Sequence, residues 1–453
     1  MERSFTGVGM RSPELSAFQL LQKAASLLVY QSVFDFEQEA GQAFLVVLQA
    51  IHNAQQQGNA EVGDAEILDC LQAHGRWFRC LAELEQSWQD LLLTCVLRDE
   101  NPFTRQAQQK DFQALSPALV LAARHDLQVL QGLSNCGEEQ LRSWVEAIAP
   151  VSFPAISCKS SSDSVVTSVK LQLERDNWAD GIEIFAAHYR QHGTGITARY
   201  AALRWHQGEL IGIAHADPVE LDDLVGYGGQ QEALLKNTEF LLKGYPSLHV
   251  LLYGSRGSGK SSVVKALLHR YSKDGLRLVE VAKSELRDLP TIADQLRPLP
   301  QKFILFVDDL SFEEDEDDYK ALKVVLEGNL TARSQNVVVY ATSNRRHLIR
   351  EFFGDRPRPK DDEIHAWDTV QEKLSFSDRF GLTLTFEPPD QATYLQIVHH
   401  LAKQANISLN SEDLDFQALQ WATRHNGRSG RTARQFIDFL RADLAVPQIP
   451  ESR

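Results

Sequence analysis

The sequence predicts an α/β fold: a parallel five-stranded sheet with helices on both faces, preceded by an all-α N-terminal domain and followed by a small all-α lid. Three observations support this prediction. Apolar residues recur at helical spacing over the first 149 residues, short apolar runs alternate with helical segments over residues 220–388, and helical spacing returns after Pro388-Pro389. Alternating strands and helices are typical of a parallel sheet.

The length and composition are those of an ordinary globular chain. It has 453 residues, of which 43% are hydrophobic and 24% charged. Such a length accommodates about two to four domains. We expect five segments, namely a helical domain at 1–149, a Ser/Pro linker at 150–165, a mixed connector at 166–219, the α/β domain at 220–388 and the helical lid at 389–453.

The net charge narrows the classes of macromolecule that this chain is expected to bind. The formal net charge of −15 argues against non-specific coating of nucleic acid. A basic cluster after the fourth predicted strand leaves a local nucleic-acid-binding face open, although a solvated face together with nucleotide-site arginines is the favoured interpretation. The cluster contains Arg345, Arg346, Arg350, Arg356, Arg358 and Lys360.

No segment has the features of an export signal or a membrane span. The N-terminus lacks the apolar region of a signal peptide, and no apolar stretch of about 18 residues occurs. The five cysteines are dispersed and lack C-x-x-C spacing, which indicates reduced thiols. We therefore expect a cytoplasmic protein without membrane association.

The N-terminal domain is predicted from apolar stripes at helical spacing, which are typical of core-facing helices. A break then follows at Pro150 and Pro154, with the serine-rich residues 160–164 as a flexible linker. The stripes comprise Leu15, Phe18, Leu21, Ala25 and Leu28, then Val33, Phe36, Ala40, Phe44, Val47 and Leu48, and a third over residues 77–93.

The connector contains a hairpin-like pattern. Two short apolar runs, residues 200–205 and 210–213, flank a turn at Gln207-Gly208. The parallel strands of the next domain are predicted at residues 248–253, 277–282, 303–308, 336–342 and 383–386. The third is a continuous apolar run, as expected for a strand buried on both faces. In the lid, Asp390, Ser411 and Ser429 are predicted N-caps of three helices.

A glycine-rich loop links the first of these strands to a helix. It has the spacing G-x-x-x-x-G-K-[ST] of a P-loop and lies between an apolar run and a helical segment, as that motif requires. Its backbone N–H groups would cradle phosphate, with Lys260 reaching the β- and γ-phosphates and Ser261 ligating Mg²⁺. The predicted phosphate-binding residues are Gly254, Ser255, Arg256, Gly257, Ser258, Gly259, Lys260, Ser261 and Ser262.

Polar residues follow the third and fourth predicted strands. Asp308 ends the third strand and is predicted to hold Mg²⁺ together with Ser261. Asp309 stands where a second carboxylate would orient or polarise the attacking water. Asn344, after the fourth strand, is placed to bind the γ-phosphate and that water.

Over residues 220–444 the chain resembles the AAA+ ATPases. More narrowly, several of its strings are similar to a bacterial AAA+ family called domain of unknown function 815. These strings are Asn237-Thr238, Asp308–Glu313, Ala341–Leu348, Ser377–Gly381 and Ser429–Arg431. The resemblance says little about the first 150 residues.

The resemblance implies further roles. Lys260 and Ser261 match Walker A, Asp308 and Asp309 match Walker B, and Asn344 matches sensor 1. Arg379 matches the arginine finger that acts on the ATP of a neighbouring subunit, which implies a homo-oligomeric ring or partial ring. Two further matches are the lid arginine, Arg431 with Arg434 as the alternate, and the segment that usually packs near adenine, Leu224, Val225, Gly226 and Tyr227.

Two departures from the resemblance bear on activity. Most AAA+ motors have Glu where this chain has Asp309, so slow turnover is compatible with the motif. Residues 283–300 also lack the aromatic-hydrophobic-glycine pore loop of protein-threading unfoldases.

Three hypotheses follow. The first is an Mg²⁺-dependent ATPase that remodels an unknown protein partner recruited by the helical N-terminal domain. The second is a slow nucleotide-dependent switch or scaffold. The third, which the acidic charge disfavours, is a nucleic-acid remodeller or loader. The sequence does not name the substrate or the ring size.

Overall fold

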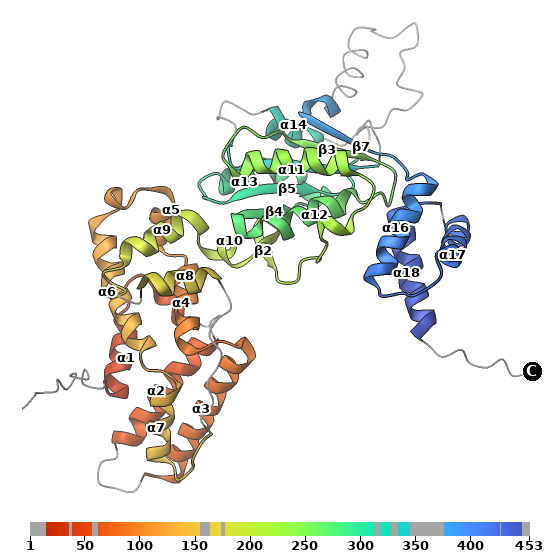
Figure 1. Ribbon diagram of the computed structural model, residues 1–453. Coiled ribbons are helices and arrows are strands. Elements are labelled where there is room, and N and C mark those ends of the chain that lie inside the picture. Colours follow the sequence, from red (N-terminus) through yellow and green to blue (C-terminus); the bar gives the residue numbers. More distant parts are fainter. Residues whose placement is uncertain are drawn as a thin grey trace, which may run out of the picture. The chain divides into compact units, whose positions relative to one another are not determined.

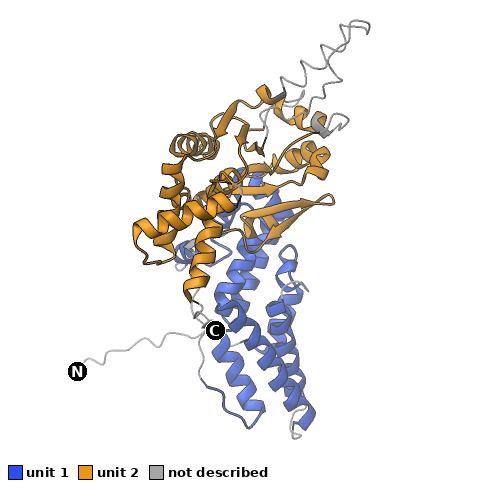
Figure 2. Ribbon diagram, turned by 90° about the vertical axis from the view of Figure 1, so that its right-hand side faces the viewer, with its two compact units in different colours: residues 1–195 blue, residues 196–453 orange. Residues whose placement is uncertain are grey.

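The computed structural model describes residues 15–35, 39–56, 62–154, 164–173, 177–312, 318–327, 334–344, 376–425 and 427–445. The chain divides into two compact units, residues 1–195 and 196–453 (Figure 2). The division falls within the predicted connector, 166–219. Most of the predicted linker and the whole arginine-rich cluster at 345–360 lie outside the described residues.

Unit 1 is helical, which confirms the prediction of a helical N-terminal region. A short helix, α10 (Gly195–Arg199), leads from it into unit 2. The helices of unit 1 that precede α10 are α1 (Ala17–Ala25), η1 (Gln31–Phe34), α2 (Glu39–Gln56), α3 (Asp64–Leu84), α4 (Trp88–Arg98), α5 (Pro102–Gln109), η2 (Phe112–Ala114), α6 (Pro117–Ser134), α7 (Glu138–Ile148), α8 (Ser164–Leu173) and α9 (Ile182–His192).

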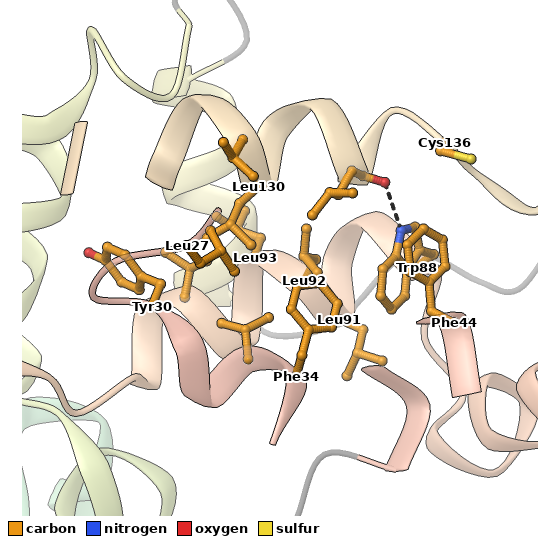
Figure 3. Packing of buried hydrophobic residues seen from close by; sticks show 14 of the residues in the cluster. Leu27, Tyr30, Phe34, Phe44, Trp88, Leu91, Leu92, Leu93, Leu130 and Cys136 are labelled. Atoms are coloured by element: carbon orange, nitrogen blue, oxygen red, sulfur yellow. Dashed lines mark hydrogen bonds between the residues drawn. The ribbon is translucent and has the colours of Figure 1, made fainter. Parts of the chain in front are cut away.

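The core of unit 1 is built around stacked aromatic rings (Figure 3). The rings of Phe44 and Trp88 lie 4.2 Å apart, and Trp88 Nε1 donates a hydrogen bond to the Leu133 carbonyl at 3.0 Å. Helices α8 and α9 contribute Val166, Phe185 and Tyr189 to the same core. These two helices therefore pack with the N-terminal helices, although most of their residues lie in the predicted connector and the first two of α8 lie in the predicted linker.

The first predicted apolar stripe is partly wrong. Phe18 and Leu28 are exposed, whereas Ala17, Leu20 and Leu27 are buried. Helix α1 ends at Ala25, so Leu28 does not continue its helical spacing. Because the buried face is centred on Ala17 and Leu20, Phe18 lies at its margin and stacks on His52 instead.

The described part of unit 2 contains a seven-stranded sheet in the order β2-β1-β4-β5-β6-β3-β7. Strands β2, β3, β4, β5 and β7 of this sheet are labelled in Figure 1. The five predicted parallel strands are all present, but the prediction of five strands in total is wrong. The strands are β1 (Ala202–His206), β2 (Glu209–Ile213), β3 (Val250–Gly254), β4 (Leu276–Glu280), β5 (Lys302–Val307), β6 (Val337–Ser343) and β7 (Leu382–Phe386).

The additional strands are those of the predicted hairpin. Strand β1 pairs antiparallel with β2 across the turn and parallel with β4, with Ala202 opposite Leu278 and Arg204 opposite Glu280. Without β1, the backbone N–H and C=O groups along that side of β4 would lack a neighbouring strand. The hairpin therefore extends the sheet.

Alternate residues of the central strands face two different cores, which explains their continuous apolar sequence. In β5, Ile304 and Phe306 pack with α11 (Gly228–Leu242) and α12 (Lys260–Tyr271), whereas Phe303, Leu305 and Val307 pack on the opposite face. That opposite face is covered by η5 (Lys283–Asp288), α13 (Leu289–Leu296) and α14 (Asp318–Glu327).

Three helices follow the sheet and form their own small core: α16 (Gln391–Gln404), α17 (Ser411–Arg424) and α18 (Gly430–Ala445). Asp390 caps α16, as predicted, and Ser429 Oγ accepts a hydrogen bond from the Thr432 N–H at the start of α18. The N-cap of α17 is Asn410, one residue before the predicted Ser411. Unit 2 also contains the short helices η3 (Leu221–Asp223), η4 (Ser272–Asp274) and η6 (Phe376–Arg379).

None of the described helices combines the length and apolar character needed to cross a membrane.

Candidate functional site

The parallel register brings the predicted polar residues to one edge of the sheet. Leu252 lies opposite Thr342 in the β3–β6 pair, and Val307 lies opposite Ala341 in the β5–β6 pair. The glycine-rich loop, Asp308-Asp309 and Asn344 thus all follow the carboxyl ends of adjacent strands. This edge is where parallel α/β sheets usually bind ligands.

Glycine is required at the start of the loop. Gly254 has a φ of 143°, and a Cβ there would lie 1.9 Å from the Phe386 carbonyl oxygen. Gly257 and Gly259 have φ values of 74° and 90°, which other residues rarely adopt. Helix α12 begins at Lys260, directly after Gly259, so its free N–H groups and positive dipole end lie beside the loop.

Lys260 is anchored inside this loop. Its Nζ donates to the carbonyls of Gly254 at 3.0 Å and Ser255 at 2.7 Å, and to Asn344 Oδ1 at 3.2 Å. The residue is buried, and burial lowers the pKa of the ammonium below its usual range, although Asp308 and Asp309 nearby oppose that shift. The site therefore holds a desolvated cation among oxygen acceptors.

Asp308 and Ser261 form a pair of oxygen ligands. Ser261 Oγ donates to Asp308 Oδ1 at 2.6 Å. Hydroxyl and carboxylate oxygens suit Mg²⁺, which takes few protein ligands and completes its shell with water and phosphate oxygens. In the described parts of the chain no group of three or more His, Cys, Asp or Glu residues could hold a metal ion. The Ser261–Asp308 pair therefore fits an ion whose remaining ligands come from phosphate and water.

Asp309 is joined to Lys260 through Asn344. The Asn344 amide donates from Nδ2 to Asp309 Oδ1 at 2.5 Å and accepts from Lys260 at Oδ1. This arrangement fixes the orientation of the amide. Asp309 has a φ of 53°, an uncommon backbone conformation for a residue other than glycine.

A cavity of about 610 Å³ joins these groups, and its volume is in the range of a small-molecule site. Predicted residues that line it are Leu224, Val225, Tyr227, Arg256, Gly257, Ser258, Gly259, Lys260, Ser261, Ser262, Asp308, Asp309, Asn344, Arg431 and Arg434. Gly254, Ser255, Gly226 and Arg379 are not among the lining residues. Gly254 and Ser255 instead hold Lys260 in place, because their carbonyl oxygens accept hydrogen bonds from its Nζ.

The segment predicted to pack near adenine contributes Leu224, Val225 and Tyr227 to the lining of the cavity. Tyr227 donates its hydroxyl proton to the Glu387 carbonyl at 2.7 Å, and its ring lies 4.9 Å from that of Phe386. Gly226 has a φ of 105°, and a Cβ there would lie 2.6 Å from Thr393 of α16. Close backbone approach thus explains the glycine.

The lid contacts the glycine-rich loop directly. The N–H of Arg431, in the first turn of α18, donates to the Gly257 carbonyl at 3.3 Å. A Cβ on Gly257 would lie 3.0 Å from Ser429 Oγ. Arg431 and Arg434 both line the cavity, so both predicted alternatives for the lid arginine remain.

Arg379 lies toward the opposite end of the sheet. It precedes β7, whose first residue, Leu382, pairs with Val250 at the start of β3. Gly254, at the end of β3 beside the glycine-rich loop, pairs with Phe386 at the other end of β7. Four residue steps along a strand span about 13 Å. The guanidinium is bound to Glu327 of α14.

Several lining residues were absent from the sequence prediction: Asp217, Val219, Asp223, Thr342, Ile397 and Leu401. Ile397 and Leu401 are spaced four residues apart on α16, a pattern that indicates only an apolar helix face. Thr342 lies within a strand of mainly apolar residues, and no local signal distinguishes it from its neighbour Ser343.

A sequence search of curated proteins finds no match to this chain. Among solved structures, the chain is similar to the Thermotoga maritima RuvB Holliday junction branch migration motor, with 16% identity, a TM-score of 0.36 and coverage of 50% of this chain and 66% of that chain. It is also similar to AMPPCP-bound DnaA from Aquifex aeolicus, with 17% identity, a TM-score of 0.35 and the same coverage. The matched part is thus just under two thirds of those chains.

Comparison with family models gives a match over residues 198–444, more than half of the chain, to the family described as Protein of unknown function (DUF815). The match includes β1 and β2, which the sequence motifs did not cover, as well as every residue around the cavity. It confirms the predicted family. The chain belongs to the family Protein of unknown function (DUF815).

Proposed function

We propose that this protein binds and hydrolyses ATP in the cavity between the glycine-rich loop and the lid. The observation that supports this most strongly is the continuous polar path from Lys260 through Asn344 to Asp309, beside the Ser261–Asp308 pair. In this proposal Lys260 recognises phosphate, the Ser261–Asp308 pair ligates the metal and Asp309 activates water. ATP hydrolysis requires these three functions at neighbouring positions.

Binding follows from the walls of the cavity. The N–H groups of residues 256–262 cradle the phosphates, and the Lys260 ammonium exchanges its carbonyl acceptors for β- and γ-phosphate oxygens. The base lies toward Val225 and Tyr227, and Ile397 and Leu401 of α16 also line the cavity. Arg431 and Arg434 supply positive charge from the lid.

Hydrolysis follows from the acidic side of the cavity. Ser261 and Asp308 would hold Mg²⁺, which when bound supplies positive charge to the phosphate oxygens. Asp309 accepts the proton of the attacking water on Oδ2, since Asn344 occupies Oδ1. Water oxygen bonds to the γ-phosphorus, the bond to the β–γ bridging oxygen breaks, and ADP and phosphate leave.

The position of Arg379 supports an oligomeric mechanism. Because Arg379 precedes β7 and does not line the cavity of its own chain, its proposed role as an arginine finger requires a second copy. In this proposal the copies form a ring or partial ring that acts on a macromolecular partner, with unit 1 as the partner-binding part.

The first prediction tests nucleotide binding. Lys260→Ala should reduce affinity for ATP at least about tenfold, because it removes a desolvated charge that faces phosphate. Titration with a fluorescent ATP analogue in Mg²⁺, combined with a phosphate-release assay, measures both activities. Lys273→Ala, at an exposed lysine of η4, is the matched control and should bind like the wild type.

Three outcomes are informative. Binding and turnover that are both lost with Lys260→Ala support the ATPase proposal. Binding without turnover by the wild type at any protein concentration supports the switch instead. A wild type that binds neither ATP nor GTP contradicts the whole assignment.

A further inference from the structure

Thr342 touches both carboxylate residues of the site. Its hydroxyl proton is donated to Asp308 Oδ1 at 2.5 Å, and its oxygen accepts the Asp309 N–H at 2.9 Å. A threonine hydroxyl has one proton to donate. That proton is therefore committed to the same Asp308 oxygen that Ser261 contacts.

We infer that Thr342 is a positioning residue for metal binding and for the water-activating carboxylate. This inference deepens the proposed function and rests on it. Thr342 orients the Asp308 side chain through one hydrogen bond and holds the Asp309 backbone through the other. In this inference Thr342 acts through these two neighbours, Asp308 and Asp309, and not on the reacting groups directly.

Packing alone does not require the hydroxyl. Along β6, Val338 and Tyr340 face the core formed with α11 and α12, and Thr342 continues that alternation at 2% exposure. A valine has nearly the same shape as threonine and would extend this apolar face. The polar group at this position is accounted for by its two partners, Asp308 and Asp309.

The second hydrogen bond explains how a short side chain serves at position 309. The left-handed backbone of Asp309, with a φ of 53°, directs its carboxylate toward Asn344. Such a conformation is unfavourable and persists only where neighbours enforce it. Thr342 Oγ1 bonds the N–H of this residue, and the Thr342 carbonyl accepts the N–H of Leu310 at 2.7 Å.

The test compares Thr342→Val and Thr342→Ser in the full-length protein. Mn²⁺, as a spectroscopic probe for Mg²⁺, is titrated by electron paramagnetic resonance in the presence of saturating ADP. ADP affinity is measured separately in EDTA. Thr342→Val should weaken Mn²⁺ binding at least about tenfold, because one buried hydrogen bond to a charged ligand is lost. ADP affinity in EDTA should change less than about twofold, and Thr342→Ser should restore Mn²⁺ binding.

Thr238→Val is the matched control. Thr238 is also fully buried, and its hydroxyl bonds the Leu234 carbonyl and Tyr340 at 2.8 and 3.0 Å, away from the cavity. This control should lower the melting temperature and leave Mn²⁺ binding unchanged. A purely structural role of Thr342 predicts the same pattern for Thr342→Val.

Several results would overturn the inference: wild-type Mn²⁺ affinity in Thr342→Val, no recovery in Thr342→Ser, or an equal loss in Thr238→Val. Each of these presupposes that the wild type binds ADP. A wild type that does not bind ADP contradicts the proposed function itself, so the two failures are distinguishable. In a turnover assay, the Mg²⁺ concentration for half-maximal rate should rise in Thr342→Val, and kcat should fall because Asp309 loses its anchor.

Discussion

Asp309 carries most of the chemistry proposed for this site. Its carboxylate accepts the Asn344 amide, and its backbone adopts a conformation that non-glycine residues seldom use. Strain of this kind tends to occur where neighbouring groups hold a functional side chain in place. A carboxylate aimed toward the cavity by its backbone partly offsets the shorter reach of Asp relative to Glu.

The proposed role of Asp309 leads to a prediction for Asp309→Asn. Turnover should fall by about 10²–10⁴, the usual contribution of a general base, because an amide does not accept a proton from water. ATP binding should persist, since the side-chain carbonyl introduced by the substitution can still accept the Asn344 N–H. Single-turnover phosphate release and an equilibrium ATP titration measure the two quantities.

The control for this variant is Asp274→Asn, at an exposed acidic residue of η4. It should leave turnover unchanged. Full turnover by Asp309→Asn would remove Asp309 from the mechanism and assign the water to another group.

At the scale of elements, single buried polar side chains connect segments that are distant in sequence. Asp126 of α6 is completely buried, and its Oδ2 accepts the N–H groups of Leu28, Val29 and Tyr30 at 2.7–3.0 Å. These three residues lie between α1 and η1. One carboxylate therefore accepts the backbone N–H groups of a segment almost 100 positions earlier in the chain. In unit 2, Tyr340 of β6 similarly bonds Asn237 and Thr238 of α11.

Removal of the first of these connections gives a prediction about stability. Asp126→Ala should lower the free energy of unfolding of unit 1 by about 2–4 kcal/mol, because three backbone N–H groups lose a fully buried, charged acceptor. Chemical denaturation followed by tryptophan fluorescence measures the change. Nucleotide affinity should stay the same, since all the cavity-lining residues lie in unit 2.

Asp111→Ala provides the comparison. Asp111 also forms an ion pair, with Arg190, but its side chain is 79% exposed, so its loss should cost less than about 1 kcal/mol. Equal destabilisation by the two variants would show that the buried turn contributes nothing specific.

At the scale of the whole molecule, the cavity and its binding groups belong to one unit, and the proposed arginine finger lies toward the other end of the same sheet. This separation is the reason for proposing that a second copy completes the active site. Arg379→Ala should retain ATP binding and lose about 10³–10⁵ in turnover, the range seen for arginine fingers.

Turnover per subunit in the wild type should also rise with protein concentration as copies associate. Arg204→Ala, at an arginine paired with Glu280 of β4, is the matched control and should have normal turnover. If turnover is independent of both concentration and Arg379, each chain works alone and the shared site is wrong.

Much of the site was predictable because its signals are local. The loop spacing at Gly254–Ser261, the acidic pair after an apolar strand and the amide after the next strand each occupy a few consecutive residues. The hairpin was recognised by the same kind of signal, but its place in the sheet was not. The pairing of β1 depends on the free backbone N–H and C=O groups along one side of β4, a strand that lies about 70 residues later in the chain.

By itself, the sequence determined the helical N-terminal region, the five strands β3 to β7, the P-loop motif and the family. Local periodicity and motif spacing express these features directly. Only the tertiary structure decided that α8 and α9 pack with unit 1, that β1 extends the sheet, that the lid contacts Gly257, and that Thr342 bonds both acidic residues. Each of these depends on contacts between segments far apart in the chain, and for such contacts residue identity gives no local signal.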